Sequence, residues 1–164
     1  MCKVGINIKD WYFINKLSTF LEQSSDISNE KKEKFIESLN ESDYKRISSY
    51  LTHLLYASEE EEKARIMGMI YKSRLLNEID NDLMLRLCSI VCKSFLPDLK
   101  KLPLYIDNGK EKSIEANNFI NLGLIDCYVG GIWIDEPSWQ LNEIGEKLCN
   151  ILSQNNWFEE SIGN

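Results

Sequence analysis

The chain has 164 residues, of which 43% are hydrophobic and 27% charged, with only eight glycines and three prolines. This composition excludes a disordered or fibrous protein and is typical of a chain that buries a hydrophobic core. The 26 acidic residues outnumber the 19 basic ones, and the net charge of −7 argues against a surface attracted as a whole to phosphate or anionic lipid.

Two helices are predicted in the N-terminal part of the chain. The first runs from Asp10 to Gln23, and its apolar residues recur at helical spacing: Trp11, Ile14, Leu17, Phe20 and Leu21. The second runs from Ser28 to Leu39 and has Phe35 and Ile36 on one side.

Cap signals introduce the next two helices. Asn40, with Asp43 three residues later, can cap a helix that carries the apolar residues between Tyr44 and Leu55. Ser58 and Glu61 have the spacing of a capping box, and this predicts the strongest helix start in the chain.

The helix that follows, to about Leu76, is predicted to be central because apolar residues cover most of its circumference. Ala64 and Gly68 lie one turn apart on it and would let a neighbouring helix approach closely. A further helix follows Asp80 and is expected to end or kink at Pro97. Its inward residues are predicted to be Leu83, Leu87, Ile90 and Val91.

The C-terminal third differs in charge and in pattern. Residues 1–109 carry 16 basic and 17 acidic side chains, whereas residues 110–164 carry 3 and 9. We therefore place a boundary near the turn-forming cluster Asp107–Lys110.

Beyond this boundary a helix, a hairpin and a last helix are predicted. The helix Ser113–Leu122 ends at Gly123, a residue suited to a left-handed C-terminal position. The extended segments are Leu124–Val129, Ile132–Ile134 and Trp139–Leu141. Gly130 and Gly131 are predicted to form the turn between the first two segments, and Asn142 to cap the last helix.

The segments from Asn118 to Ile125 and from Gln140 to Leu148 resemble the end of a winged-helix domain. In that family a helix ends in a Leu-Gly-Leu-Ile phrase, a two-stranded wing follows, and a Leu-Thr-Glu-x-Gly phrase opens the final helix. Here Asn142 stands in place of the threonine. The resemblance covers about a third of the chain. Separately, the segment from Met67 to Phe95 is loosely similar to TerB-like helical domains.

Together these patterns predict a mainly α protein. We expect a helical bundle over residues 1–109, followed by a small winged-helix-like α+β unit over residues 110–164 with a two- or three-stranded hairpin sheet. The two regions are expected to pack together as one compact body.

Winged-helix proteins bind DNA through a recognition helix, which the resemblance would place at residues 113–122. No Lys or Arg stands between Ser113 and Lys147, so Asn117, Asn118 and Asn121 could read bases but could not offset phosphate repulsion. We therefore do not expect nucleic acid as a partner, beyond weak binding at low salt around residues 31–34.

No catalytic, cofactor-binding or metal-binding residues are predicted. Cys88, Cys92 and His53 could share a metal only with a further ligand that the sequence does not supply at suitable spacing. The segment from Asp80 to Asp82 lacks the glycine and glutamate of a calcium loop. Five cysteines without a CxxC pair, together with the lack of a secretion signal or membrane span, favour a cytoplasmic protein.

Aromatic residues in the acidic third are the remaining candidates for function. Trp133 and Trp139 either fill the core or belong to an interface, and Trp157 with Phe158 either folds back onto the core or anchors a partner. The predicted partner-binding residues are Trp157, Phe158, Glu159, Glu160, Asp135, Glu136 and Trp133.

These observations favour a non-enzymatic protein-interaction module of the kind that bacteria or phages use as adaptors, inhibitors or defence-associated regulators. It would act through its acidic C-terminal face on another protein or on a second copy of itself as a homodimer. The alternative is a winged-helix transcriptional regulator that binds DNA, and an enzyme without a linear motif is the third hypothesis.

Overall fold

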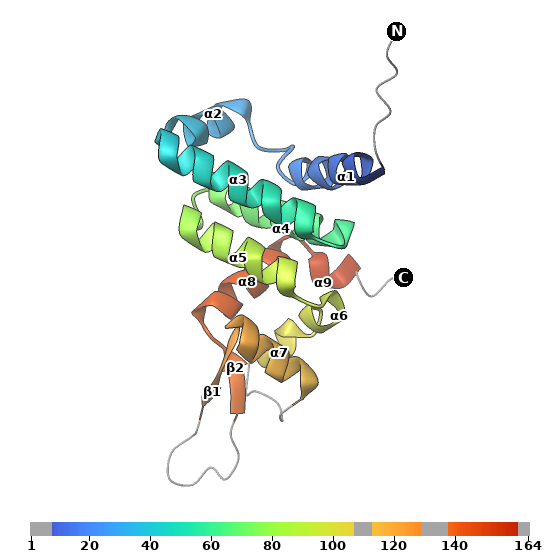
Figure 1. The fold of residues 1–164 in the computed structure, drawn as a ribbon. Helices are drawn as coiled ribbons and strands as arrows, with labels where there is room; N and C mark the ends of the chain where they lie inside the picture. The colour runs from blue at the N-terminus through green and yellow to red at the C-terminus, as the bar shows by residue number, and fades with distance from the viewer. Residues whose placement is uncertain (1–7, 107–112, 129–137, 161–164) are drawn as a thin grey trace. The chain divides into compact units, whose positions relative to one another are not determined.

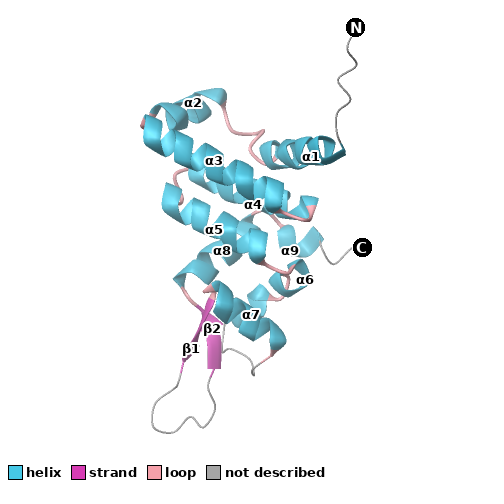
Figure 2. Ribbon diagram, viewed as in Figure 1, coloured by secondary structure: helices cyan, strands magenta, loops and turns pink. Residues whose placement is uncertain are grey.

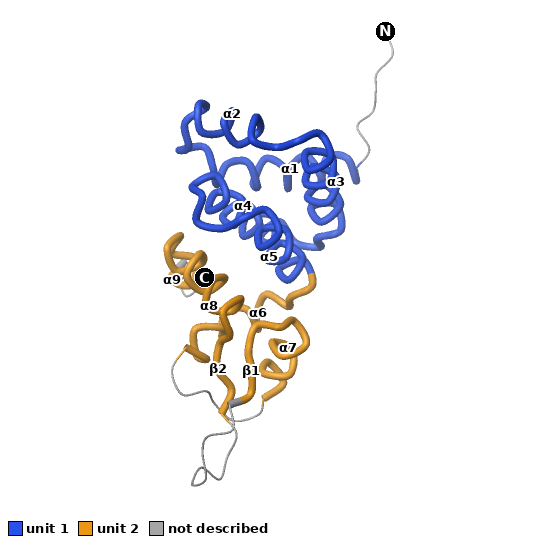
Figure 3. The backbone as a smooth tube through the Cα atoms, turned by 90° about the vertical axis from the view of Figure 1, so that its left-hand side faces the viewer, with its two compact units in different colours: residues 1–92 blue, residues 93–164 orange. Residues whose placement is uncertain are grey.

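The computed structural model describes residues 8–106, 113–128 and 138–160, which form nine α-helices, one short 3-10 helix and one two-stranded antiparallel sheet (Figure 2). The predicted mainly α fold with a small C-terminal hairpin is confirmed. The chain divides into two compact units, residues 1–92 and 93–164 (Figure 3). The predicted boundary near Asp107–Lys110 lies outside the described residues. No helix within the described ranges is long and apolar enough to cross a membrane.

The first unit is built from helices (Figure 1). They are α1 (Ile8–Glu22), α2 (Asn29–Glu37), α3 (Glu41–Ala57), α4 (Glu61–Leu75) and α5, which begins at Asn81 and ends at Lys93. Helix α4 is the central one, as predicted, because its buried residues lie all around it, including Ala64, Ile66, Met67 and Ile70. These four side chains have no exposed surface.

Helix α1 crosses α4 closely at Gly68. A Cβ atom at this position would overlap the backbone oxygen of Phe20 and lie 2.7 Å from Cγ of Gln23. The predicted close crossing is therefore confirmed, and glycine is required because α1 occupies the space of a side chain.

The side of α1 that packs against the bundle is not the predicted apolar stripe. Phe20 is buried, but Trp11, Ile14 and Leu21 are exposed. The second buried residue of α1 is Lys16, a charged residue that helical periodicity assigns to a polar position. Three of the five residues of the apolar pattern are therefore exposed to solvent.

Three predicted caps are confirmed: Asn40, Ser113 and Asn142 each accept a hydrogen bond from a backbone N–H three residues later. The capping box at Ser58 is wrong. Ser58 ends α3 instead, and its hydroxyl donates to the carbonyl of Leu55 at 2.8 Å. Helix α4 begins at Glu61 without a side-chain cap.

The second unit begins with two short helical turns, continues with a hairpin between two longer helices, and ends with a short helix. Its elements are α6 (Leu96–Leu99), the 3-10 helix Leu102–Tyr105, α7 (Ile114–Leu122), β1 (Ile125–Tyr128), β2 (Ser138–Leu141), α8 (Glu143–Gln154) and α9 (Trp157–Glu160). Pro97 does not end α5, which stops at Lys93. It occupies the first turn of α6, where its missing N–H costs nothing.

The described hairpin pairs two of the three segments that are predicted to be extended, Leu124–Val129 and Trp139–Leu141. β1 runs antiparallel to β2 with Ile125 opposite Leu141 and Tyr128 opposite Ser138, so the returning strand is the segment around Trp139. The predicted strand Ile132–Ile134 and its glycine turn lie outside the described residues.

The two sequence phrases that carry the winged-helix resemblance lie against each other. Gly123 ends α7 in the left-handed conformation, with φ of 71°. Asn142 donates from its side chain to the carbonyl of Gly123 at 3.0 Å and from its backbone to that of Leu124 at 3.1 Å. Gly145 lets the Leu124 carbonyl approach α8, because a Cβ there would overlap that oxygen. The phrase residues thus join the end of α7 to the start of α8.

Candidate functional site

The predicted C-terminal anchor is not an exposed pair. The Trp157 side chain is only 1% exposed, and Phe158 is half-buried with its ring 5.2 Å from that of Trp157. The prediction that Trp157 binds a partner is therefore corrected. Burial of its large apolar indole stabilises this terminus in the fold instead. Glu159 is exposed, whereas Trp133, Asp135, Glu136 and the side chain of Glu160 lie outside the described residues.

The surface of α7 offers less for base recognition than its sequence implies. Asn117 and Asn121 are exposed, but Asn118 donates to the carboxylate of Asp98 at 2.5 Å and so connects α7 to α6. Lys101 approaches this helix, where it forms an ion pair with Glu115. One of the three asparagines and Lys101 are thus engaged within the unit.

The outer face of α1, which we define as Ile8, Trp11, Ile14 and Leu21, is a broad apolar surface in the first unit. These side chains are 83%, 58%, 50% and 51% exposed, respectively. They lie on the side of α1 opposite Lys16 and Phe20, which face the bundle. Single exposed apolar residues are ordinary on protein surfaces, but here four of them, including a tryptophan, share one side of a helix.

Acidic residues border the outer face of α1. Asp10 and Glu22 are exposed on α1 itself. The loop between α3 and α4 adds Glu59 and Glu60, and the first residue of α4 adds Glu61; all three are exposed. We call these five residues the acidic rim.

Hydrogen bonds fix this rim next to α1. The Tyr12 hydroxyl donates to the backbone carbonyl of Glu59 at 2.7 Å, and the Thr19 hydroxyl donates to the carboxylate of Glu61 at 2.6 Å. The apolar stripe and the acidic loop therefore belong to one surface.

Lys16 holds α1 in place from the buried side. Its Nζ donates to the carbonyls of Tyr56 at 3.1 Å and Ser58 at 2.7 Å, which are orphan acceptors at the end of α3, and it lies 5.0 Å from the centroid of the Tyr12 ring. Desolvation by burial lowers the pKa of Lys16. Lys63 acts similarly by donating to the carbonyl of Cys92 at the end of α5. Sequence reasoning missed both lysines, because neither position signals a distant acceptor.

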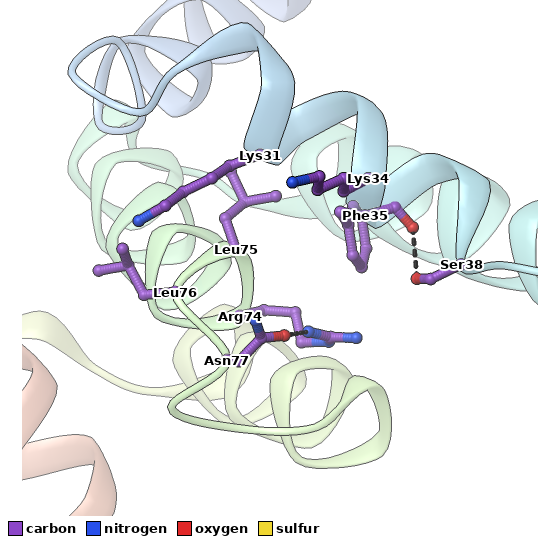
Figure 4. Close-up of a pocket in the computed structure, with 8 residues that line it drawn as sticks. All are labelled: Lys31, Lys34, Phe35, Ser38, Arg74, Leu75, Leu76 and Asn77. Carbon is purple, nitrogen blue, oxygen red and sulfur yellow. Dashed lines mark hydrogen bonds between the residues drawn. The ribbon is translucent and has the colours of Figure 1, made fainter.

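A pocket of about 400 Å³ lies in the same unit, between α2 and the end of α4 (Figure 4). It is lined by Lys31, Lys34, Phe35, Ser38, Arg74, Leu75, Leu76 and Asn77. The basic part of this lining on α2 belongs to the region, residues 31–34, where the sequence predicts at most weak nucleic-acid binding at low salt. Arg74 and Asn77 are far along the chain and were missed.

The thiols and the histidine do not form a site. Cys92 directs its Sγ to the carbonyl of Leu54 at 3.7 Å, Cys88 is fully buried, and His53 is exposed. Burial raises the pKa of the Cys88 thiol well above its ordinary value, which makes it a poor nucleophile. Within the ranges that the structure describes, no three His, Cys, Asp or Glu residues are placed to hold a metal ion.

Comparisons with known proteins add no family to this picture. The chain matches no protein-family model, no curated protein and no solved structure.

Proposed function

We propose that the protein is a non-enzymatic protein-interaction module whose binding surface is the outer face of α1. The observation that carries this proposal is the exposure of Trp11 with Ile8 and Ile14 on a helix whose opposite side is fixed against α4. Tryptophan is among the residues that contribute most to interface energy, and a rigid helix presents it at low entropic cost.

The acidic rim indicates which kind of partner fits. An amphipathic helix with an apolar face and basic flanks would cover the outer face of α1 and place its cations near Asp10, Glu22 and Glu61. A second copy of the chain would instead bring two acidic rims together, and like charges at an interface are unfavourable. The proposed partner is therefore a different protein that presents a basic amphipathic helix.

The test is a binding titration with two synthetic amphipathic peptides that share a leucine face and differ in carrying lysine or glutamate on the other. We expect the lysine peptide to bind, and amide shifts in the NMR spectrum of the protein to change along α1. The double variant Trp11→Ala/Ile14→Ala should lose about tenfold or more in affinity, since truncating an interface tryptophan commonly costs about 2 kcal/mol.

Phe95→Ala is the matched control, because Phe95 is an aromatic residue of similar exposure, 63%, in the second unit. Equal binding of both peptides, or equal loss in the control and the α1 variant, would contradict the proposal. A dimer in light scattering that the α1 variant dissociates would show that the partner is a second copy. Sequence-selective binding of duplex DNA in place of peptide would favour the winged-helix regulator.

A further inference from the structure

The pocket between α2 and α4 concentrates positive charge without an acidic residue in its lining. Lys31 and Lys34 reach it from α2 and Arg74 from α4 (Figure 4), and its other lining residues are apolar or neutral. Its volume of about 400 Å³ is within the range of small-molecule sites, about 300–1,000 Å³. The pocket can therefore attract a small anion.

Arg74 is held in position without being neutralised. Its Nε donates to the side-chain oxygen of Asn81 at 2.6 Å and its Nη1 to that of Asn77 at 2.9 Å. Its guanidinium carbon also lies 4.9 Å from the centroid of the Phe35 ring. Because both partners are neutral amides, the full positive charge of Arg74 remains for a ligand, and little rotamer freedom is left to lose.

The two lysines supply donors that can adapt to a ligand. The Lys31 ammonium forms no ion pair within the part of the chain that the structure describes. Lys34 pairs with Glu30 at 2.6 Å, but both side chains are largely exposed, so this pair is weak and can exchange. Lysine ammonium groups are compact charges that bind phosphate well. Two of the guanidinium nitrogens of Arg74, in contrast, already donate to Asn81 and Asn77.

The wall of the pocket is apolar and fixed. Phe35 and Leu75 are buried and pack in one cluster with Ile27, Leu39 and Tyr71. The Phe35 and Tyr71 rings meet edge to face at 5.9 Å. A ligand that fills the pocket therefore gains from an apolar body as well as from charge.

We propose that this pocket binds a small phosphate monoester that carries a compact apolar group. A monoester has a charge of about −1.5 to −2 at pH 7, which matches three cations of which one is partly paired. The apolar group would lie against Phe35 and Leu75, and the phosphate would lie between the α2 lysines and Arg74. This proposal is independent of the role proposed for α1.

The test uses phenyl phosphate as the probe, measured by titration calorimetry, with inorganic phosphate and phenol as the two partial probes. We expect phenyl phosphate to bind with a millimolar to high-micromolar Kd and both partial probes to bind at least about tenfold more weakly, because each lacks one half of the interaction. The double variant Lys31→Gln/Lys34→Gln should weaken binding at least about tenfold through the loss of two charge-assisted contacts.

Lys45→Gln is the matched control. Lys45 pairs with Glu41 on α3 with the same spacing and the same 2.6 Å distance as Lys34 with Glu30, and its exposure is similar. The Lys45→Gln variant should bind phenyl phosphate with the affinity of the native protein, and so should the double variant Trp11→Ala/Ile14→Ala. No saturable binding, an unchanged affinity in Lys31→Gln/Lys34→Gln, or inorganic phosphate binding as tightly as phenyl phosphate would overturn the proposal. Tighter binding of a short single-stranded DNA would do so in favour of a phosphodiester backbone.

Discussion

Replacing Gly68 by leucine should destabilise the first unit strongly. The crossing of α1 and α4 leaves no room for a Cβ, let alone three further carbons, because the backbone of Phe20 occupies that position. Overpacking of this kind costs about 3 kcal/mol, and the better helix propensity of leucine returns about 1 kcal/mol, so the net loss is about 2 kcal/mol. For a unit of this size the Tm should fall by about 8–16 °C.

Thermal unfolding followed by circular dichroism measures this change, and hydrogen exchange should show reduced protection along α1. Ser49→Leu is the matched control, since Ser49 is exposed on α3 and receives the same side chain without crowding. A second variant, Gly68→Leu/Gln23→Ala, should not recover the lost stability, because the main obstruction is a backbone oxygen. An unchanged Tm for Gly68→Leu would refute the close crossing.

Three further predictions concern the rest of the chain. Trp157→Ala should cost about 3–5 kcal/mol in chemical denaturation, because the side chain is buried; loss of less than about 1 kcal/mol would place the indole at the surface. Gly145→Ala should lower the Tm of the second unit through overlap with the Leu124 carbonyl, and an unchanged Tm would contradict that contact. Because burial raises the pKa of Cys88 from 9.0, the unfolded chain loses this proton first, and stability should fall as the pH rises above 9.0. Cys88→Ala should reduce that slope in denaturation at several pH values, and an equal slope would count against the buried thiol.

Helical periodicity correctly located α1 but not the side that it buries. Trp11, Ile14 and Leu21 follow the spacing of a core-facing stripe, yet the bundle contacts the other side through Phe20 and Lys16. An apolar stripe on a helix indicates that burial of this side is favourable, but it does not show whether the same chain or another protein buries it. For this reason the exposed stripe of α1 is the candidate binding surface.

Local signals were reliable where the chemistry was local. Asn40, Ser113 and Asn142 act within three residues of themselves, so their sequence neighbours sufficed to predict them. Ser58 failed because an equally local alternative, its bond to the Leu55 carbonyl, competes with the capping box. The pocket of Arg74 could not be predicted, since α2 and the end of α4 meet only through the tertiary fold.

The attachment of α1 leaves its proposed binding surface open to change. The contacts that hold the helix are the Gly68 crossing, the Lys16 bonds to α3 and the hydroxyl bonds of Tyr12 and Thr19, and none of them is made by a side chain of the apolar stripe. Substitutions at Trp11 or its exposed neighbours are therefore expected to have little effect on folding and, under the proposed function, to alter recognition. Natural variants could exchange partners by changing these positions alone, and a library randomised there would keep its scaffold.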